Sequence, residues 1–151
     1  MDLLAFLSLG SLFLEGLFII FSRGMAMNEV LFDGLLPWPP SVNHYWCQGK
    51  PIYKNGRRIV PRYKSDKANM FIKQTKAAIG IVEASLKRIA VEIMAFPPDR
   101  RCRDIDNIIK GIFDSLVAAK LIKDDEQVDR LLVIRGDVVK GGMVKIKVSE
   151  L

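Results

Sequence analysis

The segment DIDNIIKGIFDSLV, residues 104–117, carries the clearest helical pattern in the chain. Its apolar residues recur at intervals of three and four, which is the spacing of one face of an α-helix. These residues are Ile105, Ile108, Ile109, Ile112, Phe113, Leu116 and Val117. The pattern predicts an amphipathic helix that buries this face.

The segments upstream of this helix predict two strands and a second helix. IAVEIMAF (89–96) alternates and is rich in branched residues, which predicts a strand that the following two prolines end. Ser65 can cap a helix that runs to about Arg88 and has an apolar stripe. Residues 29–36 read as a short strand that stops at PWPP.

The remaining segments complete an α+β pattern. Residues 41–63 are loop-like, and YKNGRR within them carries an Asn-Gly signal for a small hairpin. Two final strands, about 127–137 and 143–149, are predicted to form a hairpin through KGG. We therefore expect a two-layer α+β fold, in which two main helices pack on one face of a mixed β-sheet.

The polar face of the 104–117 helix carries candidate metal ligands. Asp106, Lys110 and Asp114 follow one another at intervals of four, and Asp104 stands at the helix entry. Two such carboxylates can hold Mg²⁺, whose remaining ligands would be substrate phosphate and water. Plain helix capping by aspartate and an Asp106–Lys110 ion pair explain the same spacing equally simply.

Basic residues surround these carboxylates and give the chain a positive charge. Arg100, Arg101 and Arg103 directly precede the helix, and guanidinium groups suit phosphate oxygens. The net charge of +6 indicates a polyanionic partner, either nucleic acid or an anionic membrane surface.

The loop at 41–63 is a second candidate for contact with DNA. Its cations include Lys54, Arg57 and Arg58, and aromatic residues are interleaved with them. Such aromatic rings can stack on unpaired bases while the cations hold phosphates. Alternatively, Trp38 and Trp46 simply pack over the core.

Histidine and cysteine are too few to support several classes of site. His44 is the only histidine, while Cys47 and Cys102 form no CxxC pair. A zinc site or a histidine-based triad therefore has almost nothing to build on, and free thiols are expected. Any catalysis is expected to use carboxylates and an oxygen-binding metal.

Residues 1–27 form a hydrophobic extension that differs from the rest of the chain. The stretch 3–21 is long enough to span a bilayer, although Glu15 lies near its middle. Three interpretations remain: a start site at Met25 or Met27, a membrane anchor, or an additional packed helix. We expect a cytoplasmic, nucleoid-associated protein, with membrane attachment only if 3–21 is a true anchor.

Four segments together resemble the RusA family of Holliday junction resolvases. They are LPWPPSVNHYW (36–46), PPDRRCRDIDNIIKGIFDSL (97–116), LIKDDEQV (121–128) and KGGMVKIKV (140–148). The specific part is D-x-D-N-x-x-K followed by D-D-x-Q-V. The resemblance implies a RusA-like endonuclease domain over residues 28–151, of the kind common in prophages.

The resemblance also implies an activity and a set of site residues. It implies a homodimeric, Mg²⁺-dependent endodeoxyribonuclease, with Mn²⁺ as a substitute and no small-molecule cofactor, that nicks opposing strands of four-way DNA junctions. By position, Asp104, Asp106 and Asp125 correspond to metal-binding catalytic aspartates, and Lys110 to an essential lysine. The alternative function is that of a prophage protein that binds branched DNA without cleaving it.

The position of Asp125 raises a question about how the site is assembled. Asp124, Asp125 and Glu126 can be turn formers or can add a ligand to the first acidic pair. A helix from Asp106 to Lys120 spans roughly 21–22 Å, which predicts Asp125 near its far end. One chain could bring Asp125 to the acidic pair by folding residues 121–125 back along the helix, but five residues reach at most about 17 Å. We therefore expect each metal site to be shared between two antiparallel subunits.

Overall fold

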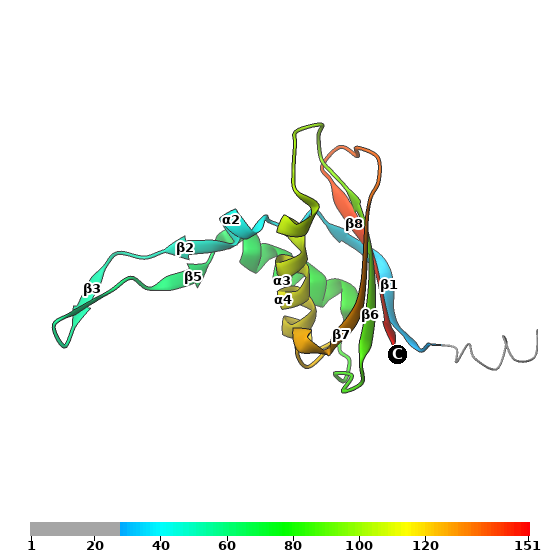
Figure 1. Cartoon of the computed structure of the whole chain (residues 1–151), viewed down its shortest axis with the longest axis horizontal. Coiled ribbons are helices and arrows are strands. Elements are labelled where there is room, and N and C mark those ends of the chain that lie inside the picture. Colours follow the sequence, from blue (N-terminus) through cyan, green and yellow to red (C-terminus); the bar gives the residue numbers. More distant parts are fainter. Residues whose placement is uncertain (1–27) are drawn as a thin grey trace, which may run out of the picture.

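The computed structural model describes residues 28–151, whose centre is a four-stranded mixed sheet (Figure 1). Its strands are β1 (Val30–Pro37), β6 (Ile89–Phe96), β7 (Val128–Arg135) and β8 (Met143–Glu150), in the order β1-β8-β6-β7. β6 pairs parallel with β7, while β8 pairs antiparallel with both β1 and β6. The expected α+β class and mixed sheet are confirmed.

The two main helices lie on the same side of this sheet in Figure 1. They are α3 (Asp66–Ile79) and α4 (Ile109–Ala118), and the single-turn 3₁₀ helix η1 (Ile105–Ile108) leads into α4. The apolar face predicted for residues 105–117 supplies Ile108, Ile112 and Leu116 to the core. Burial of each such side chain contributes about 1.5–3 kcal/mol, which holds α4 and its polar face in place.

Helix α3 ends nine residues before the expected boundary at Arg88. Gly80 follows it with φ of +79° and ψ of −155°, a conformation that is open essentially to glycine alone. The apolar spacing from Ala68 to Ile79 therefore predicted the helix face but not where the helix stops. Residues 81–88 instead cross to β6, and Ser85 forms a parallel bridge with Ile122.

The predicted hairpin between the last two strands is wrong. β7 and β8 are both present near their expected positions, but β6 lies between them. Helix α4 carries the chain from the end of β6 back to the start of β7, so these two strands pair parallel as a β-α-β unit. The KGG sequence lies in the connector 136–142, in which Gly141 and Gly142 have positive φ.

A two-stranded arm projects away from the sheet and helices (Figure 1). After the single-turn helix α2 (Val42–Tyr45), its elements are β2 (Trp46–Gln48), β3 (Ile52–Lys54), β4 (Arg57–Ile59) and β5 (Arg62–Lys64). β2 pairs with β5, and β3 pairs with β4 across Asn55 and Gly56, which both have positive φ. The hairpin predicted at YKNGRR is therefore confirmed, within a longer arm than expected.

The hydrophobic extension proposed for residues 1–27 lies outside the described residues. Within residues 28–151, no helix is long and apolar enough to cross a membrane.

Candidate active site

Asp104 and Asp106 lie on the exposed entry to the α4 helix. Asp104 occupies the N-cap position of η1, but its side chain makes no capping hydrogen bond. Its Oδ2 instead accepts a hydrogen bond from Asn107 Nδ2 at 3.3 Å. Within the described part of the chain neither carboxylate takes part in an ion pair. Both are therefore free to bind a ligand, and the capping explanation does not account for Asp104.

Lys110 connects the two acidic segments of the site. Its Nζ lies 2.9 Å from Asp114 Oδ1 and 2.6 Å from Asp125 Oδ2. The polar stripe predicted on α4 is thus used by the Lys110–Asp114 pair rather than by Asp106 with Lys110. The carboxylate of Asp125, and next that of Asp114, raises the pKa of Lys110, and Lys110 lowers the pKa of Asp125. The lysine is charged and the aspartate ionised at neutral pH.

Asp125 does not lie at the far end of α4, as the helix length suggested. The helix ends at Ala118, and Lys120 then adopts a positive φ while Leu121 N–H donates to the Leu116 carbonyl. The chain therefore turns back along the helix. Asp125 reaches Lys110, one helical turn beyond Asp106, so the distance argument for a site shared between subunits is wrong.

Gln127 holds Asp125 in this position, a role that its residue type alone did not predict. It ends the single-turn 3₁₀ helix η2 (Asp125–Gln127) and is 7% exposed. Its Oε1 accepts the backbone N–H groups of Lys123 and Asp124, at 2.7 and 2.9 Å. Its Nε2 donates to the carbonyls of Ser85 and Lys87, at 2.9 and 2.8 Å. The quoted D-D-x-Q-V pattern contained this residue but gave no structural reason for it.

The neighbours of Asp125 serve structural roles. Asp124 accepts the Glu126 N–H at 3.0 Å and caps η2, as the turn-former interpretation proposed. Glu126 pairs with Arg88 instead of facing α4. Of these three acidic residues, only Asp125 contacts Lys110 in the described residues.

The donor chemistry around α4 fits a hard divalent cation, although one chain does not present a complete ligand set. Asp104 and Asp106 offer carboxylate oxygens that form no ion pair with any described residue, and such oxygens are the ligands that these cations prefer. Among residues 28–151, however, no group of three histidine, cysteine or acidic side chains is arranged to hold a metal ion.

The predicted DNA-contacting arginines differ in their freedom to bind phosphate. Arg103 donates two hydrogen bonds to the Asp99 carboxylate, at 2.6 and 2.8 Å, and these are the main cause that lowers the pKa of Asp99 to about 2. The Arg103 side chain therefore stabilises the connector between β6 and η1. Arg101 is 84% exposed, and Arg100 is also exposed.

The other predicted cations, Lys54, Arg57 and Arg58, lie on β3 and β4 of the arm and are exposed. Figure 1 shows this hairpin projecting far from α4. The two groups of cations therefore form separate surfaces.

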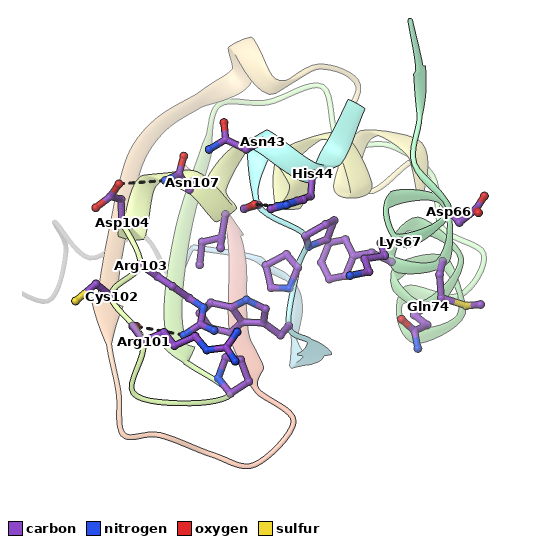
Figure 2. Close-up of a pocket in the computed structure, with 18 residues that line it drawn as sticks. Asn43, His44, Asp66, Lys67, Gln74, Arg101, Cys102, Arg103, Asp104 and Asn107 are labelled. Atoms are coloured by element: carbon purple, nitrogen blue, oxygen red, sulfur yellow. Dashed lines mark hydrogen bonds between the residues drawn. The ribbon is translucent and has the colours of Figure 1, made fainter. Parts of the chain in front are cut away.

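A cavity of about 870 Å³ opens beside Asp104 (Figure 2). It lies between the segment 38–44, the N-terminal half of α3 and the connector that leads into η1. Its lining includes Arg101, Arg103 and Asn107 together with apolar side chains. A binding space thus adjoins Asp104, one of the candidate metal ligands.

Comparisons with known proteins agree with the resemblance seen in the sequence. Residues 37–149 match the family model described as "Endodeoxyribonuclease RusA". The chain is 41% identical over 128 residues to the crossover junction endodeoxyribonuclease rusA of Enterobacteria phage HK97, which covers 83% of this chain and 98% of that relative. It is 34% identical over 120 residues to the protein of the same name from Escherichia coli K12, covering 77% and 92% of the two chains.

Proposed function

The chain belongs to the RusA family of endodeoxyribonucleases, and on that premise we propose that it resolves Holliday junctions by nicking opposing strands in DNA recombination and repair. The observation that carries this proposal is the contact of Lys110 with Asp125, which joins the two motif-bearing segments at one surface. That surface exposes the carboxylates of Asp104 and Asp106.

We assign metal binding to Asp104, Asp106 and Asp125, and the metal is Mg²⁺, for which Mn²⁺ can substitute. When bound, such a cation activates water and neutralises charge on the scissile phosphate. The chain itself supplies the ammonium group of Lys110, which is positioned by Asp114 and can donate hydrogen bonds to a phosphate oxygen. Exposed Arg100 and Arg101 bind the adjoining DNA backbone, while Lys54, Arg57 and Arg58 contact a more distant part of the junction.

The acting form in this proposal is a homodimer in the cytoplasm, associated with the nucleoid. Two opposing nicks need two sites, and a two-fold dimer supplies them symmetrically. Among residues 28–151, strand β7 also has no partner on one side and exposes Leu131, Leu132 and Ile134, which suits contact with a second copy.

The function is tested with the full chain and a synthetic four-way junction, with linear duplex as the comparison. We expect nicking that requires Mg²⁺ or Mn²⁺ and is much weaker on the linear duplex. Asp106→Asn should bind the junction and fail to cut it, whereas Asp137→Asn, an equal charge change on the exposed 136–142 connector, should cut normally. Full activity in EDTA or in Asp106→Asn would contradict the proposal, and junction binding without any cleavage would favour the non-cleaving alternative.

A mixing experiment determines how the metal site is assembled. Asp106→Asn and Asp125→Asn, each inactive alone, are combined and allowed to exchange subunits. If each site takes Asp125 from the partner, a mixed dimer regains one intact site and nicks one strand. If each site is built within one chain, the mixture stays inactive.

A further inference from the structure

The cavity beside Asp104 is larger than a metal ion and its phosphate require. Its volume of about 870 Å³ lies in the range of sites that enclose a small organic group. The proposed chemistry uses only its edge, where Asp104 and Asn107 lie (Figure 2). The proposed chemistry assigns no role to the rest of the cavity.

The walls of the cavity combine flat apolar surface with polar groups that can form hydrogen bonds. Trp38 and Met70 supply apolar surface, while Phe71 lines the cavity with only 2% of its surface exposed. His44 and Gln74 supply polar groups from two different elements, α2 and α3. An aromatic ring with polar atoms on its edge would match both kinds of wall at once.

These walls are held together by contacts that do not depend on a ligand. Ser65 Oγ donates to the His44 carbonyl at 2.7 Å, and Ser65 N–H donates to the Tyr45 carbonyl at 2.9 Å, so α2 is tied to the start of α3. Ser41 Oγ lies 2.9 Å from His44 Nδ1, which orients the imidazole ring. The cavity is therefore already formed in the free protein.

The Trp38 wall is fixed from behind by the connector before β8. A Cβ atom at Gly142 would come within 2.9 Å of both Trp38 Cβ and Pro98 Cδ, so the backbone packs directly against them. Trp38 also packs against the hydrophobic core, so its side chain is held in place.

We propose that this cavity binds one unstacked nucleobase of the DNA junction, next to the phosphate that is cut. The inference rests on the proposed function, because the DNA must approach Asp104. Bases near a branch point are the easiest to extrude from a stack, and aromatic walls accept any base because every base has a π-face. Lys67 and the exposed Arg101 lie among the lining residues, where they can bind the flanking phosphates. This positive charge suits a nucleotide within DNA.

The test asks whether the effect of a cavity substitution on junction affinity depends on the presence of one particular base. Met70→Ala and Gln74→Ala change exposed residues one helical turn apart on α3, so neither should disturb the core; Met70 is 56% exposed. Their junction affinities are measured in Ca²⁺, on an intact junction and on junctions with an abasic nucleotide moved stepwise across the mapped nick. We expect a loss of about five- to tenfold on the intact junction, and no loss when the abasic position is the bound nucleotide.

Lys73→Ala provides the matched control, because it lies on α3 outside the cavity lining. Any change in its junction affinity should be the same for intact and abasic junctions, since the loss of a charge outside the cavity does not depend on a base. Equal effects of Met70→Ala and Gln74→Ala on every junction would overturn the inference. So would cavity occupancy by a free nucleoside monophosphate without any coupling to a base in DNA. Wild-type nicking is measured in parallel, because its failure would reject the proposed function instead.

Discussion

Replacing Gln127 with leucine should destabilise the domain more than any other single change in the acidic segments. The substitution preserves most of the side-chain volume but removes four hydrogen bonds, two accepted by Oε1 and two donated by Nε2. Each such bond contributes about 0.5–1.5 kcal/mol net, and an unsatisfied buried partner costs more. Because three of the four bonds are only partly buried, water can satisfy some of the freed groups, and we expect a loss of about 2–4 kcal/mol.

The measurement is urea unfolding followed by circular dichroism, supported by thermal unfolding. For a domain of this size the loss corresponds to a fall in Tm of roughly 5–15 °C. Lys123→Ala serves as the control, because its side chain is exposed and it should change stability by less than about 0.5 kcal/mol. If Gln127→Leu is as stable as this control, the four bonds do not anchor η2 in the way that the distances indicate. Junction cleavage should fall as well, because Asp125 loses its support.

Three further perturbations probe other parts of the structure. The pKa of Asp99 is lowered from 3.8 to about 2, chiefly by Arg103, so its contribution to stability is complete above about pH 4 and is lost as the pH falls toward 2. Urea midpoints measured from pH 5 to pH 2 should therefore fall more steeply for wild type than for Asp99→Asn; parallel curves would refute this. Gly80→Ala should lower the free energy of unfolding by about 1–3 kcal/mol in the same assay. A higher free energy of unfolding would mean that α3 can continue through this position. Asp114→Asn should lower the nicking rate about tenfold with little change in junction affinity, because Lys110 loses an ionic partner whose side chain is only 17% exposed. An unchanged nicking rate would show that Asp125 alone positions the lysine.

Periodicity in the sequence predicted the elements well and their partners poorly. The strand at 89–96 has the predicted limits, and the apolar face of the 104–117 segment is the buried one. Both follow from which side chains lie on one face, which is local information. That β6 separates β7 from β8 depends on pairing between distant segments, and no spacing within either strand encodes it.

In the candidate site, too, local spacing predicted contacts within one helix, whereas contacts between distant segments were not predicted. Spacing placed Lys110 and Asp114 on one stripe of α4, and they do form an ion pair. Asp125 was placed by helix length, and a dimer was preferred to a chain reversal; the structure shows that the chain does turn back after Ala118. Gln127 bonds to segments about 40 residues away, so only the folded chain reveals its role.

The start of β1 and the end of β8 lie side by side, so a circular permutation of the described domain is possible. Glu150 N–H donates to the Glu29 carbonyl at 2.9 Å, so the last strand finishes beside the start of the first. In a chain reduced to residues 28–151, a short linker could join these two ends, and new termini could open at the exposed Lys140–Gly141 bond. Such a circular permutant would begin with β8 and end after β7, yet residues 104–125 would remain one uninterrupted stretch. The candidate catalytic residues therefore lie in one continuous segment, and the order of the surrounding strands, arm and helix in the sequence can change without dividing that segment.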